Sequence, residues 1–254
     1  MIDIHCHILP GIDDGAKDLI ESIGMAKHAA SKGITTIFAT PHHKNGRYYN
    51  KGNKILAKVN KLNSKLRKAK IPVKILPGQE PRIYGELLED YKAGKILTLN
   101  NQHKYLLVEL PDTHVPAYAV KLLFNIQLEG ITPIIVHPER NVQIRENPDI
   151  LHQLVMNGAA TQITASSLIG YKGKKLRKFS LQLIKHHLTH FIASDSHRLS
   201  RSSFKLNEAY EVINEEFGTD YSNLLQENTR KLLNGNGINR QEPNKIKMNR
   251  WFHF

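Results

Sequence analysis

Short runs rich in β-branched residues alternate with longer amphipathic stretches along almost the whole chain, and this alternation constrains the fold most. Strands are expected over seven ranges: 2–7, 34–40, 73–76, 105–110, 132–137, 160–164 and 190–194. Helices are expected between and after them, over 17–32, 53–70, 83–91, 116–129, 148–157, 176–187, 204–217 and 221–233. Strands joined by helical crossovers lie parallel, so the pattern predicts an α/β fold in one large domain.

Histidines and carboxylates follow six of the seven predicted strands, at the point where each strand ends. His5 and His7 lie two residues apart on the first strand, so their side chains are expected to point the same way. In a closed barrel of parallel strands, the carboxyl ends meet at the face that holds the active site. The residues that would gather there are His5, His7, Asp14, His42, Glu80, Glu109, His137, Asp195 and His197.

This set is larger than one metal ion needs. Imidazole and carboxylate ligands suit zinc, manganese or iron, but one ion takes only about four to six of them. Nine candidates therefore predict two or three metals that share carboxylates. Clustered metals favour in-line displacement at phosphorus, as in phosphoester hydrolysis, although the spacing of the residues also leaves amide hydrolysis open.

The motifs that carry these residues resemble those of the PHP (polymerase and histidinol phosphatase) superfamily. They are, in chain order, His5-x-His7, Asp13-Asp14-Gly15, Pro41-His42-His43, Gly78-Gln79-Glu80, His137-Pro138-Glu139-Arg140-Asn141 and Ser194-Asp195-x-His197. More closely, the set resembles the manganese-dependent tyrosine-protein phosphatases encoded with bacterial capsule and exopolysaccharide genes. The resemblance covers residues 1–233 and implies a distorted seven-stranded (β/α)7 TIM-like barrel with a trinuclear metal centre.

The resemblance also implies roles for individual residues. The nine candidates would be the metal ligands, with Mn²⁺ as the ion, Fe or Zn as alternatives, and Glu80 as the bridging ligand. Of the neighbouring pair Asp13 and Asp14, the expected ligand is Asp14, and Arg140 would hold the phosphate. The expected substrate is phosphotyrosine in the C-terminal tyrosine cluster of a bacterial tyrosine kinase that controls polysaccharide export.

Hydrolysis of phosphotyrosine releases a phenolate, which is a fairly good leaving group because the pKa of tyrosine is about 10. Proton donation to it therefore helps but is not essential. We expect His43, or His197 where it is not committed to a metal, to supply that proton.

A cysteine-dependent tyrosine phosphatase is excluded. That mechanism needs the pattern Cys-x5-Arg, whereas Ile12 stands six residues after Cys6, the chain's one cysteine. Cys6 is expected to be a small buried residue on the strand face opposite His5 and His7.

The chain carries a formal net charge of +13, and much of its basic charge lies in two clusters. Eight lysines and arginines and no acid lie between residues 51 and 70, and a second cluster covers 172–178. Such charge attracts anionic partners, and we expect Lys54 and Lys58 to draw in an acidic, phosphorylated tail. The alternative interpretation is that these residues form a solvent-exposed helix face with no specific partner.

The expected compartment is the cytoplasm. One cysteine cannot form an internal disulfide, and the first residues have no signal-peptide pattern. No apolar run approaches the roughly 18 residues of a membrane span, so the protein would be peripheral to a membrane complex at most. The sequence leaves the oligomeric state open.

Two other functions compete with the tyrosine phosphatase. A histidinol-phosphate phosphatase, or another PHP phosphoesterase, would use similar ligands but gives no reason for the basic segment 51–70. A nucleic-acid-binding protein with a metal site would use the basic charge, yet 51–70 has no interleaved aromatic residues that could stack on bases. Residues 234–254 form a basic tail ending in Trp251-Phe252-His253-Phe254, for which packing or disorder is expected.

Overall fold

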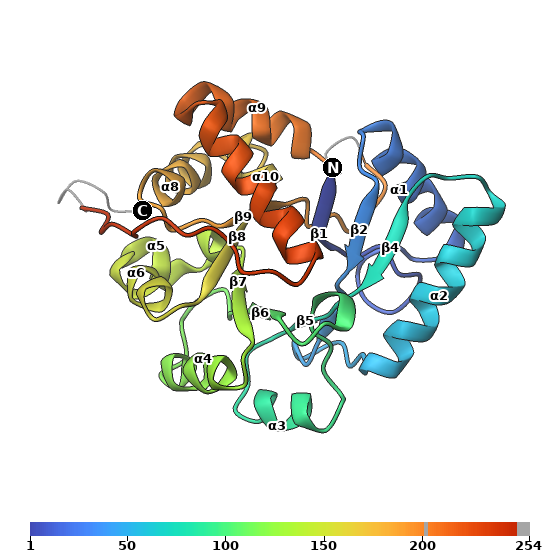
Figure 1. Ribbon diagram of the computed structural model, residues 1–254, viewed down its shortest axis with the longest axis horizontal. Helices are drawn as coiled ribbons and strands as arrows, with labels where there is room; N and C mark the ends of the chain where they lie inside the picture. Colours follow the sequence, from blue (N-terminus) through green and yellow to red (C-terminus); the bar gives the residue numbers. More distant parts are fainter. Residues whose placement is uncertain (201–202, 248–254) are drawn as a thin grey trace.

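The computed structural model describes residues 1–200 and 203–247 (Figure 1). All seven predicted strands are present within two residues of the expected ends, and two further strands have two residues each. The strands are β1 Ile2–Cys6, β2 Thr36–Ala39, β3 His42–His43, β4 Lys74–Pro77, β5 Glu80–Pro81, β6 Tyr105–Glu109, β7 Thr132–Val136, β8 Ala160–Thr164 and β9 Phe191–Ala193.

The predicted helices are also present, with one shortened. The helices are α1 Leu19–Ser31, α2 Gly52–Lys68, α3 Leu87–Lys92, α4 Ala119–Leu128, α5 Val142–Glu146, α6 Asp149–Met156, α7 Ala165–Leu168, α8 Lys174–Lys185, α9 Leu206–Phe217 and α10 Thr219–Leu233. The helix expected over 83–91 begins only at Leu87, because the Ile83 amide donates to the Glu109 carbonyl (2.8 Å) and keeps that segment beside β6. The short helices α5 and α7 were not expected.

The strands form three parallel sheets where one continuous barrel was expected. Their orders are β1-β2-β4, β3-β5 and β6-β7-β8-β9. The first sheet gives way to the second at Pro41, which has no N–H to donate to a neighbouring strand. Isolated bridges join the sheets, from Arg82 to Glu109 on one side and from Cys6 to Ser196 on the other. The carboxyl ends of the strands therefore still face one common region.

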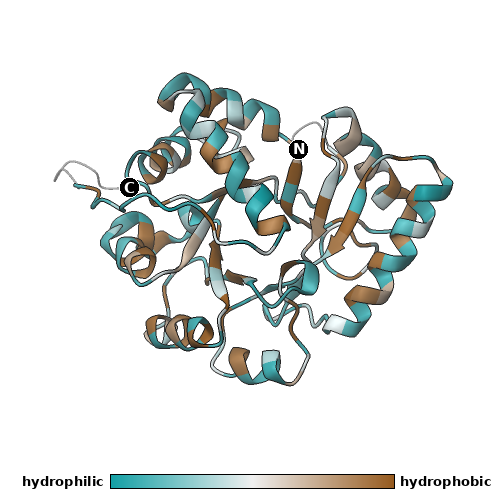
Figure 2. Ribbon diagram, in the orientation of Figure 1, coloured by the Kyte–Doolittle hydropathy of each residue, from teal (hydrophilic) through white to brown (hydrophobic). Residues whose placement is uncertain are grey.

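Apolar residues lie on both sides of the strands (Figure 2). Leu106 and Val108 of β6 belong to the large cluster that includes helix residues such as Leu122 of α4. Leu107, between them, belongs to a second cluster with Ile4 and the interior residues of other strands. Successive residues of a strand thus pack alternately against the helices and against the interior. Both faces of the sheets are buried, as parallel sheets require.

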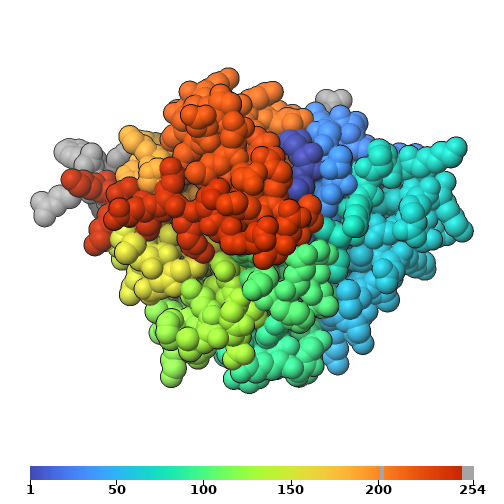
Figure 3. All heavy atoms as spheres, in the orientation of Figure 1, coloured from blue at the N-terminus to red at the C-terminus, as the bar shows by residue number. Residues whose placement is uncertain are grey.

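The segment after α10, residues 234–247, crosses the molecule as a strap (Figure 3). The Tyr105 hydroxyl donates to the Asn236 carbonyl (2.5 Å), and the Asn244 amide donates to the His186 carbonyl (2.9 Å). Arg240 donates to the carbonyls of Gly158 (2.9 Å) and Ala159 (3.1 Å). The strap therefore covers the amino ends of β6 and β8. The aromatic residues 251–254 lie outside the described residues.

Replacing Arg240 by alanine should destabilise the fold. The Gly158 and Ala159 carbonyls, directly before β8, would lose their contacts with the guanidinium, so a loss of about 1–3 kcal/mol in the free energy of unfolding is expected. Urea unfolding measures it. Arg230→Ala is the matched control, because Arg230 is exposed and pairs only with Glu227 on the same helix, a contact worth about 0.5 kcal/mol or less. Equal losses in the two variants would contradict the role of the strap.

Across the described ranges, no helix is long and apolar enough to cross a membrane.

Candidate metal centre

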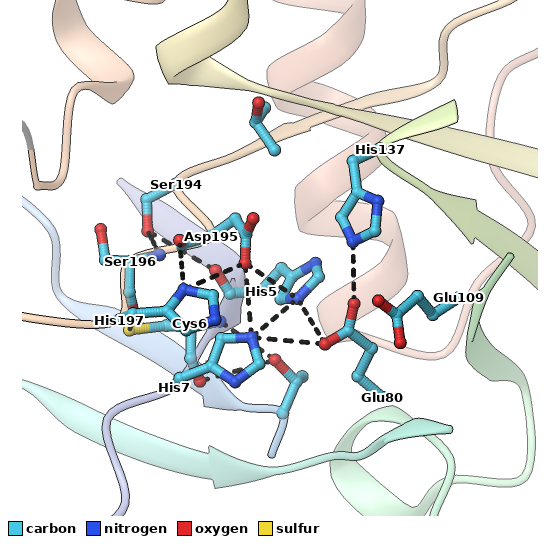
Figure 4. Close-up of polar contacts among 12 residues, drawn as sticks. His5, Cys6, His7, Glu80, Glu109, His137, Ser194, Asp195, Ser196 and His197 are labelled. Carbon is cyan, nitrogen blue, oxygen red and sulfur yellow. Dashed lines mark hydrogen bonds and ion pairs between the residues drawn. The ribbon is translucent and has the colours of Figure 1, made fainter. Parts of the chain in front are cut away.

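The predicted polar residues at the strand ends converge on one buried centre (Figure 4). His5 and His7 come from the end of β1, and their Nε2 atoms lie 3.3 Å apart. Cys6, between them, points the other way and its thiol donates to the Ser196 carbonyl. The alternation expected from the sequence is therefore present in β1.

Glu80 lies at the middle of this centre and is fully buried. Its Oε2 atom is 3.4 Å from His5 Nε2, 3.3 Å from His7 Nε2 and 2.8 Å from His42 Nδ1. Its Oε1 atom is 3.0 Å from His137 Nε2. Glu80 reaches this position because β5 pairs with β3 in a register that sets Glu80 directly against His42. One carboxylate thus faces four imidazoles.

Three groups of side chains have ligand atoms close enough to share an ion. They are His5, His7 and Glu80; His42, Glu80 and Glu109; and His7, Asp14, His42 and His197. Each pair of groups shares one residue, as expected for adjacent ions with common ligands. Asp195 joins the first group, because its Oδ1 atom is 3.4 Å from His5 Nε2 and 3.3 Å from His7 Nε2.

Several buried oxygens in this centre lack the hydrogen bonds that burial normally demands. They are Asp14 Oδ1, Glu80 Oε2 and Asp195 Oδ1. Each is a carboxylate oxygen aimed at imidazole nitrogens of the centre. Divalent cations would satisfy them, and the mixed imidazole and carboxylate donors suit manganese, iron or zinc. The residues present therefore fit a cluster of divalent metals.

Two polar residues fix the orientation of the histidines on β1. His5 Nδ1 lies 2.8 Å from Gln162 Oε1, and His7 Nδ1 lies 2.8 Å from Asp13 Oδ2. Both contacts place the ring proton on Nδ1 and leave Nε2 free to bind a metal. Asp13 is thus occupied with His7, whereas Asp14 faces His42 and His197 at 3.6 Å each.

Arg82 forms an ion pair with Glu109 that the sequence did not suggest. Its Nε and a terminal nitrogen donate to the two carboxylate oxygens at 2.8 and 3.0 Å. A bidentate pair of this kind fixes the plane of the carboxylate. Arg82 therefore orients Glu109, which lies 3.7 Å from His42.

The charges of the centre act strongly on one another. Burial opposes the ionisation of Glu80, but His5 and His42 outweigh it and hold the pKa of Glu80 well below its usual value. Burial likewise opposes ionisation of Asp195, yet Arg140 and His5 hold the pKa of Asp195 well below the usual range. Both carboxylates are therefore ionised at neutral pH, as metal ligands must be.

Arg140 lies at the rim of the centre, following the end of β7. A terminal nitrogen of its guanidinium lies 2.6 Å from Asp195 Oδ2, and its buried Nε has no hydrogen-bond partner. The open pocket above the centre is lined by Asp14, Glu109, Arg140 and other site residues. Arg140 is therefore positioned to contact an anion that enters this pocket.

The two proton donors expected from the sequence are placed differently. His43 points away from His42, with Nδ1 2.7 Å from the Asn50 carbonyl, and it does not line the pocket. His197 does line it, and its Nδ1 contacts the Asp195 carbonyl at 3.0 Å, which leaves Nε2 facing Asp14. The structure thus brings His197, and not His43, to the centre.

The backbone is unusual at two of these positions. His137 and Asp195 have φ values of 36° and 51°, in the left-handed region that residues other than glycine rarely adopt. Left-handed residues of this kind concentrate at functional sites, where the surrounding structure holds them in place. Both belong to the centre described above.

Comparison with known proteins places the chain among bacterial phosphatases. Residues 1–234 match the family model described as capsular polysaccharide synthesis, CpsB/CapC. The chain is 49% identical to a tyrosine-protein phosphatase, YwqE, of Bacillus subtilis (strain 168), over 100% of both chains. It is 39% identical to a putative tyrosine-protein phosphatase, CapC, of Staphylococcus aureus, over 99% of each.

Solved structures give the same result. A structure from a report on YwqE from Bacillus subtilis and CpsB from Streptococcus pneumoniae, described as unique metal-dependent tyrosine phosphatases, matches with a TM-score of 0.95 and 49% identity. The match covers 98% of this chain and 100% of the other. A histidinol phosphate phosphatase from Lactococcus lactis matches with a TM-score of 0.52 at 16% identity, over 85% of this chain and 95% of the other, and therefore shows a shared fold only.

Proposed function

This chain belongs to the CpsB/CapC family of capsular polysaccharide synthesis proteins, and on that premise we propose that it is a metal-dependent tyrosine-protein phosphatase. The activity is hydrolysis of phosphotyrosine, and it does not use a cysteine. The observation that carries the proposal is the group of nine converging histidines and carboxylates, whose buried unpartnered oxygens call for divalent cations.

The proposed metal ligands are those expected from the sequence: His5, His7, Asp14, His42, Glu80, Glu109, His137, Asp195 and His197. Divalent ions clustered in this way activate water and neutralise charge on a phosphate group. His7, His42 and Glu80 each belong to two of the three groups, and Glu80 is the proposed bridging ligand because its carboxylate has two ligand oxygens. Mn²⁺ is the proposed ion, with Fe or Zn as alternatives that the donor set also accepts.

Arg140 binds the phosphate of the substrate. Its guanidinium reaches the rim of the pocket while it is anchored to Asp195 at 2.6 Å, so its direction is fixed before the substrate arrives. A preorganised cation beside the phosphate stabilises negative charge in the transition state. His197 Nε2 faces the pocket beside Asp14 and is the proposed proton donor when it is not bound to a metal. Burial and the neighbouring His7 lower the pKa of His197 to about 4, so this donor is seldom protonated at neutral pH, and the low basicity of phenolate makes its proton helpful rather than required.

The partner is the phosphotyrosine-bearing tail of a bacterial tyrosine kinase that controls capsular or exopolysaccharide synthesis, and the setting is the cytoplasm. The family description in terms of capsular polysaccharide synthesis supports this assignment. The basic face of α2 begins beside the site, where Lys58 donates to the Pro10 carbonyl at 2.8 Å, and it attracts an acidic tail. Nucleic acid is not a proposed partner.

The proposal extends to the architecture. The catalytic domain covers residues 1–233, and its seven longer strands form a distorted (β/α)7 barrel. The bridges between the three sheets support this description, and so does the convergence on one centre of the candidate ligands that end or follow six of these strands. The described part of the tail, residues 234–247, is an appendage that packs on the opposite end of the strands.

Removal and restoration of metal tests the function. Chelated protein should lose hydrolysis of p-nitrophenyl phosphate and of a phosphotyrosine peptide, and Mn²⁺ should restore both, because the ligands are held in place by the protein itself. Activity is followed by release of p-nitrophenol and of phosphate. Cys6→Ser is the matched control and should leave the rates unchanged, since the Cys6 thiol points away from the centre.

Three outcomes would contradict the proposal. Activity that survives chelation, or that disappears in Cys6→Ser protein of normal stability, would exclude a metal-dependent mechanism without cysteine. Reconstituted protein that cleaves histidinol phosphate while leaving the phosphotyrosine peptide intact would retain the metal centre and refute the proposed substrate.

A further inference from the structure

A second pocket adjoins the metal centre on the far side of Arg140. Its volume is ≈ 400 Å³, and the residues that line it include Arg140, Ser166, Tyr171, Lys172 and Arg198. The pocket above the metal centre shares four of the residues that line the second pocket, namely Arg140, Lys172, Asp195 and His197, so the two cavities share one wall. The rest of the second pocket, around Ser166, Tyr171 and Arg198, has no role in the metal chemistry described above.

The charge of this pocket is positive. Lys172 has no ion pair or hydrogen bond to any other described residue, so its ammonium group is available. Arg198 donates to the Asp14 carbonyl (3.2 Å) at the pocket wall, and its ion pair with Glu21 (3.6 Å) partly offsets its charge. Asp195 contributes the one carboxylate, and Arg140 already neutralises it at 2.6 Å.

Hydroxyl groups supply hydrogen-bond donors beside these cations. The pocket lies at the end of β8, the one long strand that supplies no candidate metal ligand. There, the buried Glu139 carboxylate accepts from both the amide and the hydroxyl of Thr164, at 3.0 Å each. The hydroxyl of Ser166, in the next turn, lines the pocket. Glu139 thus fixes the turn that presents Ser166.

We propose that this second pocket binds a second phosphate monoester on the same peptide, while the phosphotyrosine to be hydrolysed occupies the metal centre. The inference rests on the proposed function and deepens it, because it names a preference for substrates phosphorylated at two nearby tyrosines. A phosphate monoester carries a charge of about −1.5 to −2 and three acceptor oxygens. It therefore matches a pocket with several cations and hydroxyl donors better than a ligand with a single carboxylate group would.

The geometry favours a neighbouring residue of one peptide. Residues two apart in an extended chain lie on the same side, about 6.4–6.8 Å from each other, which suits two adjoining pockets that share Arg140 and Lys172 at their boundary. Tyr171 is 59% exposed at the second pocket, where its ring offers a face to the ring of a second phosphotyrosine.

The test compares three peptides on Mn²⁺-reconstituted enzyme. Each has one phosphotyrosine, and the position two residues away holds phosphotyrosine, glutamate or unmodified tyrosine. We expect kcat/KM for the first cleavage of the doubly phosphorylated peptide to exceed that of the singly phosphorylated peptide by about tenfold or more at low ionic strength, after correction for its two sites. The preference should shrink as salt is added.

Lys172→Ala should reduce this preference to about twofold, because it removes the unpaired cation of the second pocket. Lys172→Arg should retain it. Lys174→Ala is the matched control, since Lys174 is an exposed lysine two residues away that lines neither pocket, and it should leave the ratio of the two kcat/KM values unchanged.

The outcomes separate the two proposals. If no phosphotyrosine peptide is cleaved, the proposed function fails. If the singly and doubly phosphorylated peptides are cleaved equally well, or if Lys172→Ala and Lys174→Ala behave alike, the enzyme is a phosphatase without this second site. If glutamate serves as well as the second phosphotyrosine, the pocket recognises any negative charge and the assignment to phosphate is wrong.

Discussion

Glu80→Gln should abolish most of the activity and empty much of the metal centre. The Glu80 carboxylate faces His5, His7 and His42 through one oxygen and His137 through the other. Glutamine has the same shape, but it loses the negative charge and turns one oxygen into an N–H donor. Because Glu80 belongs to two of the three groups, at least one ion should be lost per chain.

The expected loss in kcat is at least about a hundredfold to a thousandfold, the range found when one group that stabilises transition-state charge is removed. Metal content is measured by elemental analysis of the desalted protein, and the rate by hydrolysis of p-nitrophenyl phosphate. Glu109→Gln should do less, since Glu109 belongs to one group only and is also paired with Arg82.

Glu86→Gln is the control for a charge change near the site, since Glu86 is exposed and belongs to none of the three groups. It should keep its metals and its rate. A Glu80→Gln protein with full metal content and a rate within about twofold of the unmodified enzyme would show that Glu80 is not a shared ligand. Circular dichroism spectra matching those of the unmodified protein would establish that the loss is local.

The sequence located the strands well because buried parallel strands are short apolar runs separated by amphipathic helices. The same pattern put the candidate ligands at one end of the strands, and all nine meet there in the structure. The division into three sheets was missed. Neither β3 nor β5 has more than two residues, so neither gives a periodic signal, although Pro41 directly before β3 marks the break.

The residues that orient the ligands were harder to find. Gln162 and Arg82 act on His5 and Glu109 from other strands, and no local pattern connects these pairs. One signal was available: Gln162 is a polar residue inside a wholly buried strand, and such a residue needs a partner. The placement of Asp13 and Asp14 depends on the turn between them and His7, which sequence spacing does not specify.

The direction of His43 follows from the alternation of side chains along a strand, which was predicted for β1 but not for β3. Alternation along a strand assigned Cys6 to the side opposite His5 and His7, as the structure has it. The same alternation in β3 turns His43 away from His42 and toward the Asn50 carbonyl. Because β3 is only two residues long, no sequence pattern indicated that His42 and His43 belong to a strand.

Gly15→Ala should remove much of the activity, although Gly15 is not one of the proposed metal ligands. A Cβ atom at Gly15 would lie 2.0 Å from the His7 carbonyl oxygen and 2.5 Å from His7 Cβ. These are backbone and near-backbone atoms, which cannot rotate away as the end of a long side chain can. The Ala16 amide donates to that same carbonyl at 3.0 Å, so the loop is tied to His7 at the point of contact.

To relieve the contact, the loop must move away from His7 by an ångström or more. Asp13 would then lose its 2.8 Å contact with His7 Nδ1, and Asp14 would move relative to His42 and His197. A displacement of about 1 Å in a catalytic arrangement can cost about a hundredfold in rate, and that loss in kcat is expected here. Overpacking should also lower the free energy of unfolding by about 1–3 kcal/mol.

The matched control is Gly85→Ala, because no atom lies within 4 Å of a Cβ built at Gly85. That variant should keep both rate and stability, as measured by p-nitrophenyl phosphate hydrolysis and urea unfolding. Loss of stability alone in Gly15→Ala, with metal content and kcat of the folded fraction unchanged, would show that the loop moves without carrying Asp13 and Asp14. Loss of kcat and of metal together would show that the close approach of Gly15 to His7 holds the two aspartates in register with the histidines.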